Sequence, residues 1–244
     1  MHSVDLIVLL PLLGAGAAFL SKFVDPRGRL AAALVGLSTL AAAAALITVS
    51  PSLAAHGEVG LVVGGWSEAV GVHLYLDVPA AILLLVLLVV AGCIVLYALG
   101  EGSYGSLFYA VYAIAVSAMA GVILSADLFN LFVFFEVLSL SATILIAYRQ
   151  GLTALYAAFR YLLVTVLSVA LYLVGLFVLY RATGELSLSA LADAIGAGAL
   201  EHRVVRSAGV LLFAGVAIRT ALVPFHLWLP EAHAQAPHPV SAIL

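Results

Sequence analysis

Charged side chains are scarce in this chain of 244 residues: 9% are Asp, Glu, Lys or Arg, whereas 66% are hydrophobic and the mean hydropathy is +1.27. A soluble domain carries roughly 25% charged residues, so too few are present here to cover a surface that faces water. The nine Lys and Arg residues form no basic tract, and twelve Asp and Glu residues give a net charge of −3. This balance excludes a nucleic-acid-binding protein and predicts an integral membrane protein.

Cysteine is nearly absent as well. Cys93 is the single cysteine and lies in an apolar run, which excludes a disulfide framework and a cysteine-based metal site. The first apolar run follows Asp5 rather than a basic flank, so we expect a retained membrane span instead of a cleaved secretory signal. We find no ligand pattern for flavin, quinone or an iron–sulfur cluster and expect no cofactor.

The uncharged runs have the length of membrane spans, because about 20 apolar residues cross a hydrocarbon core of ~30 Å. They predict seven helices and the start of an eighth near Pro239, over residues 6–21, 30–57, 78–100, 102–126, 128–148, 161–180 and 207–230. The runs are continuously apolar, which favours helices over barrel strands. Four of the eight prolines lie in the last 21 residues and predict a broken seventh helix. The fold class is therefore all-α, a polytopic transmembrane helix bundle.

Basic residues between the spans give an orientation. The first loop contains Lys22, Arg27 and Arg29, whereas residues 50–76 contain no Lys or Arg; the positive-inside bias then places the N-terminus outside. Arg149 and Arg160, in the expected connection between the fifth and sixth helices, agree with this orientation. The arginines that oppose it are Arg181, Arg203 and Arg206. We expect residues 50–76 to form an ordered external loop and 186–199 a short surface helix.

Two charges fall inside predicted spans. Glu136 lies nine residues after Asp127 and thirteen before Arg149, roughly 13 to 20 Å from either helix end, and its face also carries Ser139 and Thr143. It is either a neutral residue that joins two helices or a proton-relay carboxylate. Arg219 precedes Pro224, which removes a backbone donor. It either marks an ion site at a broken helix or snorkels beside a simple proline kink.

The last segment, PFHLWLPEAHAQAPHPVSAIL, contains His226, Glu231, His233 and His238. Three histidines and a carboxylate suggest a zinc site, but the spacing is not that of a helical metalloprotease motif, and we expect no metal. Histidine titrates near neutral pH, so a proton relay or gate is favoured. One or two of these histidines are equally compatible with ordinary hydrogen-bonded core residues.

Three segments carry a resemblance to a known family. They are ADLFNLFVFFEVLSL, AFRYLLVTVLSVALYLVGLFVLYRATGEL and AIRTALVPFHLWLPEAHAQAPHPVSAIL. They resemble the antiporter-like subunits of respiratory complex I, Mrp-type cation/proton antiporters and membrane-bound hydrogenases. The resemblance divides the chain into 1–104, with helices one to three and the external loop 50–76, and 105–244, with helices four to seven and the start of helix eight. It implies an incomplete first inverted repeat, because family members have about fourteen helices in two repeats.

The resemblance also implies roles. Glu136 and Arg219 match the charged pair of a proton half-channel, although the family usually has lysine at the latter position and often lysine where this chain has Arg160. Arginine effectively cannot lose its proton, so Arg219 is expected to control the charge of Glu136 without carrying a proton itself. We expect Arg160, His226, His233 and His238 to complete the path or its electrostatic control.

The function implied is a proton-translocating subunit, with or without Na⁺ exchange, in a multi-subunit antiporter or redox-driven pump, and this chain is not the redox catalyst. Its partners are expected to be other membrane subunits, the lipid bilayer and the transported H⁺ and Na⁺. The inner membrane of a prokaryotic cell is its expected location. The alternatives are a non-transporting assembly subunit, whose buried pair only joins helices, and an intramembrane metalloenzyme.

Overall fold

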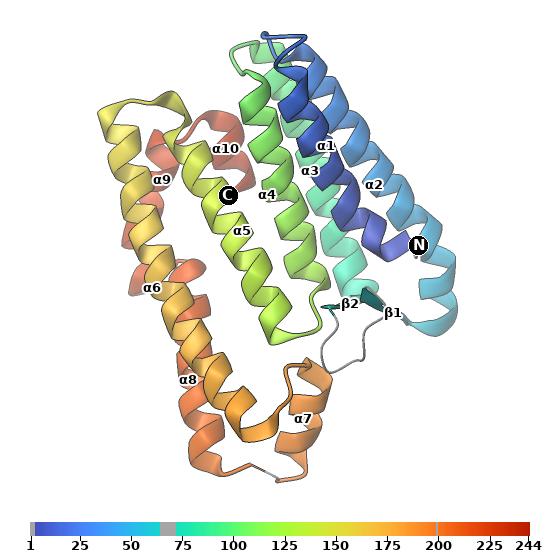
Figure 1. Cartoon of the computed structure of the whole chain (residues 1–244), viewed down its shortest axis with the longest axis vertical. Coiled ribbons are helices and arrows are strands. Elements are labelled where there is room, and N and C mark those ends of the chain that lie inside the picture. The colour runs from blue at the N-terminus through green and yellow to red at the C-terminus, as the bar shows by residue number, and fades with distance from the viewer. Residues whose placement is uncertain (1–2, 64–71, 199) are drawn as a thin grey trace.

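The computed structural model describes residues 3–63, 72–198 and 200–244, most of which are helical (Figure 1). The elements are α1 (Ser3–Ser21), α2 (Arg29–His56), β1 (Glu58–Val63), β2 (Val72–Asp77), α3 (Val78–Glu101), α4 (Ser106–Leu124), α5 (Leu128–Ile146), η1 (Ala147–Arg149), α6 (Leu152–Thr183), α7 (Leu188–Gly196), α8 (His202–Arg219), η2 (Phe225–Trp228), α9 (Leu229–Gln235) and α10 (His238–Ile243). In the described part of the chain, six helices, α1 to α6, are long and apolar enough to cross a membrane. The predicted helical membrane bundle is confirmed.

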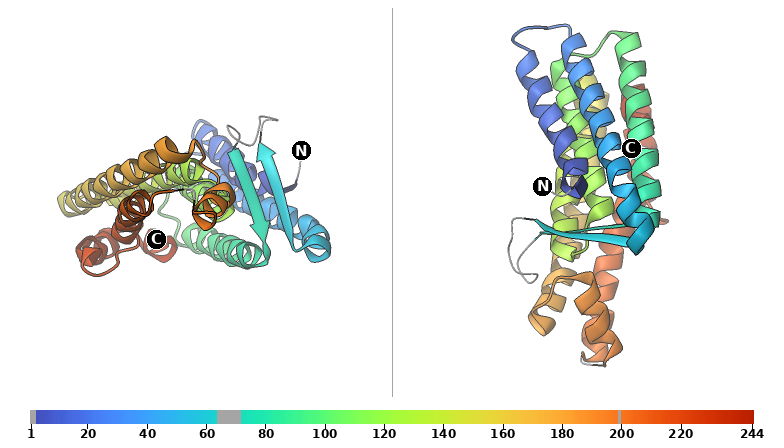
Figure 2. Two further views of the ribbon diagram at one scale, coloured as in Figure 1. Left: turned by 90° about the horizontal axis from the view of Figure 1, so that it is seen from below. Right: turned by 90° about the vertical axis from the view of Figure 1, so that its right-hand side faces the viewer.

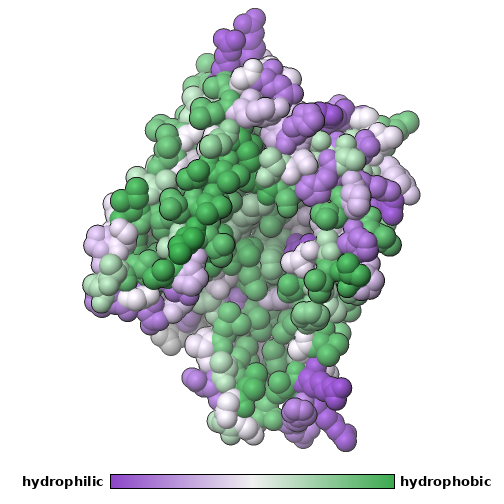
Figure 3. All heavy atoms as spheres, turned by 180° about the vertical axis from the view of Figure 1, so that it is seen from behind, coloured by the Kyte–Doolittle hydropathy of each residue, from purple (hydrophilic) through white to green (hydrophobic). Residues whose placement is uncertain are grey.

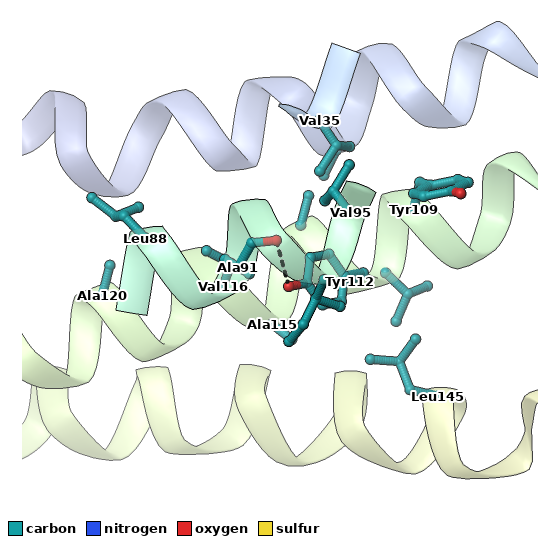
Figure 4. Packing of buried hydrophobic residues seen from close by; sticks show 14 of the residues in the cluster. Val35, Leu88, Ala91, Val95, Tyr109, Tyr112, Ala115, Val116, Ala120 and Leu145 are labelled. Carbon is teal, nitrogen blue, oxygen red and sulfur yellow. Dashed lines mark hydrogen bonds between the residues drawn. The ribbon is translucent and has the colours of Figure 1, made fainter. Parts of the chain in front are cut away.

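Helix α4 is the most enclosed of these helices, since 72% of the residues in its apolar membrane-spanning stretch are buried. Its aromatic residues Phe108, Tyr109 and Tyr112 are among the largest fully buried side chains. The Tyr112 hydroxyl donates to the Ala91 carbonyl on α3 at 3.0 Å (Figure 4), and the Ser117 hydroxyl donates to the Val8 carbonyl on α1 at 2.8 Å. These bonds satisfy polar groups that lipid could not satisfy, and they hold α1 and α3 against α4.

A two-stranded antiparallel hairpin lies across one end of the helices (Figure 2). Glu58 of β1 pairs with Asp77 of β2, and the Asp77 side chain then caps α3 by accepting from the Ala80 N–H at 2.8 Å. Residues 50–56 complete α2, as the uncharged run 30–57 predicts, so the connection begins later than residue 50, and it contains two strands that the sequence did not predict. Residues 64–71 of the expected loop, which include Gly64, Gly65 and Trp66, lie outside the described residues.

Helices α5, α6 and α8 form a second packed group, with its own cluster of buried hydrophobic residues. A Cβ on Gly215 of α8 would lie 2.8 Å from the Ser168 carbonyl of α6, so the absence of a side chain permits this close approach. The expected surface helix at 186–199 is confirmed as α7. The division at residue 104 stays a prediction, and one hydrophobic cluster includes residues on both sides of it.

Helix α6 corrects one expectation directly. The sequence predicts a sixth span over 161–180 with Arg160 in the preceding connection, but α6 begins at Leu152 and Arg160 is its ninth residue. The 32 residues of α6 extend about 48 Å, longer than the ~30 Å hydrocarbon core. A charge near one end of a long helix is compatible with membrane insertion, which is why Arg160 did not have to end the helix.

The expected seventh span over 207–230 is divided, as the prolines predict. Helix α8 begins at His202, ends at Arg219 and is followed by Thr220–Pro224, η2 and α9. In Figure 1, α8 rises from the lower end and stops about midway along α6. The expected start of an eighth helix is confirmed as α10. Figure 3 shows the result at the surface: apolar side chains cover much of the middle, and hydrophilic residues gather at the two ends and in a patch on the right.

Candidate functional site

The broken helix supplies the site with a cation and with free backbone groups. After Arg219 the chain turns through Ala221, whose φ is 52°, and Pro224 has no N–H to continue a helix. The Ile218 carbonyl accepts hydrogen bonds from the Ala221 N–H at 3.3 Å and from the Trp228 indole at 3.0 Å. The Trp228 side chain, which follows the break, thus satisfies a carbonyl at the end of α8, and Arg219 is the last residue of that helix.

Arg219 reaches across to α5. Its Nη1 donates to the Phe135 carbonyl at 2.9 Å and also to the Ser139 hydroxyl, and its guanidinium carbon lies 4.8 Å from the centre of the Phe135 ring. Phe135 and Ser139 are four residues apart, so both lie on the same face of the helix. Two hydrogen bonds and a ring contact therefore set the position of the charge.

Glu136 completes the pair. Its Oε1 lies 3.7 Å from Nη2 of Arg219, and the two side chains are 36% and 10% exposed, respectively. This distance is an ionic contact but longer than a hydrogen bond, and Nη2 has no hydrogen-bond partner among the described residues. The structure therefore brings Glu136 and Arg219 together as expected, with the carboxylate held by charge and not by a fixed bond.

A second ion pair joins Arg160 of α6 to Glu231 of α9. The sequence places these residues 71 positions apart, and only the return of the chain after the break brings them together. Their side chains are 39% and 46% exposed, so solvent or a partner reaches this pair more readily than it reaches Arg219. Arg160 does not join Glu136 and Arg219 in one ion-pair cluster within the residues that the structure describes.

The three histidines do not form one cluster. His226 of η2 has a buried Nδ1 with no hydrogen-bond partner in the described part of the chain. His233 of α9 shares a 2.8 Å hydrogen bond with the Ser241 hydroxyl of α10. His238 lines a cavity of about 410 Å³ with Cys93 and other residues of α3 and α10. Within residues 3–63, 72–198 and 200–244, no group of three His, Cys, Asp or Glu residues could hold a metal ion.

The sequence did not predict that two aromatic residues, Tyr161 and Trp228, belong to this site. Tyr161 of α6 packs edge-on against Trp228, with ring centroids 5.1 Å apart, and it lies within electrostatic reach of both Arg219 and Glu136. Little in the sequence marks Tyr161 as a site residue, because a single tyrosine in an apolar helix is common. Ser139 was noted for its position on the face of Glu136, but its bond to Arg219 was not foreseen; Thr143 donates only to the Ser139 carbonyl, at 2.8 Å.

Comparison with known proteins identifies relatives of this chain. Residues 125–244 match the family described as NADH:quinone oxidoreductase/Mrp antiporter, TM. The NADH-quinone oxidoreductase subunit N of Desulforudis audaxviator is 34% identical over 250 residues, which cover 100% of this chain and 49% of that protein. The family match begins just before α5 and includes α8, the helices that carry Glu136 and Arg219.

Two solved structures have the same fold over 99% of this chain. A chain of the membrane-bound sulfane sulfur reductase, an archaeal respiratory membrane complex, has a TM-score of 0.90, 27% identity and 49% of its own length covered. A chain of the Mrp complex from Dietzia sp. has a TM-score of 0.87, 26% identity and 45% of its length covered. The chain thus spans about half the length of these relatives. Residues 125–244 thus carry the transmembrane domain described as NADH:quinone oxidoreductase/Mrp antiporter.

Proposed function

We propose that the chain forms a proton half-channel in a membrane subunit of a multi-subunit antiporter or redox-driven ion pump, and that Glu136 carries the proton. The observation that supports this most directly is the contact of Glu136 with Arg219 beside the break in α8. A carboxylate inside a membrane helix is costly and is commonly retained for function. Arginine keeps its charge, so Arg219 acts as a fixed cation and Glu136 as the group that gains and loses the proton.

The contacts of Arg219 fit this division of roles. Its Nη1 is bound to the backbone and hydroxyl of α5, which holds the cation in place whether Glu136 is charged or neutral. Because Glu136 makes no hydrogen bond to the guanidinium at 3.7 Å, protonation of the carboxylate breaks no such bond. The partly exposed Glu136 side chain can therefore exchange its proton with water or a neighbouring group.

The charge at the two ends of the bundle supports an orientation with the N-terminus outside. The α1–α2 loop and η1 share one end (Figure 1). Four of the nine basic residues lie at this end: Lys22, Arg27, Arg29 and Arg149. Three lie at the opposite end: Arg181, Arg203 and Arg206. The positive-inside rule places the end with Lys22, Arg27, Arg29 and Arg149 in the cytoplasm. The membrane we infer is the inner membrane of a prokaryotic cell.

Proton flux into liposomes tests the assignment. Glu136→Gln in the reconstituted complex that contains this subunit keeps the size of the side chain but removes the titratable proton, so we expect normal assembly and loss of most flux. Glu185→Gln, between α6 and α7, removes a carboxylate outside the membrane and should leave flux unchanged. Flux at the wild-type rate in Glu136→Gln would refute the relay and favour the rival function, an assembly subunit whose ion pair only joins α5 to α8. Repeating the assay with and without a Na⁺ gradient shows whether H⁺ moves in exchange for Na⁺.

A further inference from the structure

The end of the bundle opposite the hairpin has more positive charge than its own carboxylates neutralise. The Asp25 carboxylate accepts hydrogen bonds from the backbone N–H groups of Leu30 at 2.8 Å and Arg27 at 3.0 Å. These bonds, with that of Leu30 the largest cause, lower the pKa of Asp25 and keep it ionised. Even so, no carboxylate of the described residues lies within ion-pair distance of the Arg27 or Arg29 guanidinium.

Both arginines line a cavity of about 420 Å³ between the α1–α2 loop and the α3–α4 loop. Gly28 lies between them with a φ of +73°, and a Cβ at this position would be 2.6 Å from the Tyr104 carbonyl. The glycine thus permits the two loops to approach closely, with one arginine on either side of it in the chain. Tyr104, Tyr109 and Leu99 line the cavity from α3, α4 and the loop that joins them.

A hydrogen-bond donor of α4, Tyr109, also lines this cavity. Tyr109 is only 2% exposed, yet its hydroxyl makes no hydrogen bond to any residue that the structure describes, whereas the neighbouring Tyr104 hydroxyl donates to Glu101 at 3.1 Å. With two unpaired guanidiniums in its lining, the cavity offers donors and positive charge, which suit the oxygens of a phosphate group.

We propose that this cavity binds the headgroup phosphate of an anionic phospholipid. A lipid is favoured over free phosphate because the wall continues into apolar surface: Leu99 is 40% exposed and Leu96, on the same helix, is 69% exposed, so acyl chains can lie along α3 below the headgroup. Lys22, whose ammonium lies 4.0 Å from the centre of the Phe19 ring, adds a further cation at the same membrane surface. Juxtamembrane basic residues of this kind attract anionic lipids.

Native mass spectrometry of the complex that contains the subunit tests the proposal, with phosphatidylglycerol, phosphatidylcholine and inorganic phosphate as probes. We expect phosphatidylglycerol to be retained in preference to phosphatidylcholine and not to be displaced by millimolar inorganic phosphate. Arg27→Gln/Arg29→Gln should weaken retention by at least tenfold, because hydrogen bonds to a charged group are lost. Arg203→Gln/Arg206→Gln, at the opposite end, is the matched control and should change nothing.

Tyr109→Phe removes only the hydroxyl and keeps the packing of the ring, so it tests the cavity even if the double arginine variant folds poorly. We expect a several-fold loss of phosphatidylglycerol retention with an unchanged midpoint of thermal unfolding. Equal retention of the two lipids, or wild-type retention in both the Tyr109→Phe and the double arginine variants, would overturn the proposal. Displacement by inorganic phosphate would show instead that the site takes the free ion.

Discussion

Removing the carboxylate of Glu136 tests how strongly the two helices depend on the charge of Arg219. Four proteins form a double-mutant cycle: wild type, Glu136→Gln, Arg219→Gln and the double variant. A second cycle with Arg160→Gln and Glu231→Gln provides the comparison, because that pair is of the same chemical kind but more exposed. Each cycle isolates the coupling between its two residues from the effects of either substitution alone.

The expected magnitudes follow from distance and burial. Two unit charges separated by 3.7 Å attract each other by about 4 kcal/mol at an effective dielectric of 20 and by about 1 kcal/mol in bulk water. Arg219 is 10% exposed and Glu136 36% exposed, so we expect an intermediate coupling of roughly 2 kcal/mol. The side chains of Arg160 and Glu231 are 39% and 46% exposed, and a pair of this kind couples by less than about 1 kcal/mol.

The free energy of unfolding in mixed detergent micelles is the quantity to measure, at low and at high salt. The Glu136–Arg219 coupling should exceed that of Arg160–Glu231 and should depend less on salt, because solvent ions screen buried pairs less than exposed ones. If the two couplings are equal, or if the first falls to that of the exposed pair in high salt, the argument from burial is wrong. The assignment of Arg219 as a fixed, enclosed cation would fail with it.

Three further predictions concern other parts of the chain. Arg219→Lys should retain proton flux in liposomes because it keeps a positive charge, whereas Arg219→Ala should lose most of it; equal flux in the two variants would contradict the role of the charge. Gly215→Ala should lower the free energy of unfolding by about 1–3 kcal/mol in chemical unfolding, because the new Cβ meets the Ser168 carbonyl. Gly209→Ala on the same helix is the control. No atom lies within 4 Å of its Cβ, so the free energy of unfolding should change by less than about 1 kcal/mol. The pKa of Asp25 in the folded protein lies below its ordinary value of 3.8. Its contribution to the free energy of unfolding should therefore be fully present above that value and lost as the pH falls through the folded pKa. If the free energy of unfolding of wild type exceeds that of Asp25→Ala by more at lower pH, this prediction is wrong.

The hydrophobic pattern by itself predicts most of the helices. A bilayer requires long apolar segments with internally satisfied backbones, so the scarcity of charge already indicates where α1 to α5 lie. Prolines predict the break after Arg219 for an equally local reason, the missing N–H. The same pattern places the start of α6 too late, because it treats Arg160 as a boundary, whereas α6 begins at Leu152. It missed the hairpin of β1 and β2, whose register depends on pairing between two segments and on contacts with the residues that join α4 to α5.

The candidate site divides in the same way. Charge at membrane depth singles out Glu136 and Arg219, since the cost of burying a charge is a property of one residue and its position in a span. Which groups hold those charges depends on how α5, α6 and α8 pack. Only that packing places Nη1 of Arg219 on Phe135 and Ser139 and turns Trp228 back to the Ile218 carbonyl. The sequence therefore determined where the ionisable groups enter the membrane, and the tertiary structure decided their partners, because hydrogen bonds and ion pairs require contact between segments far apart in the chain.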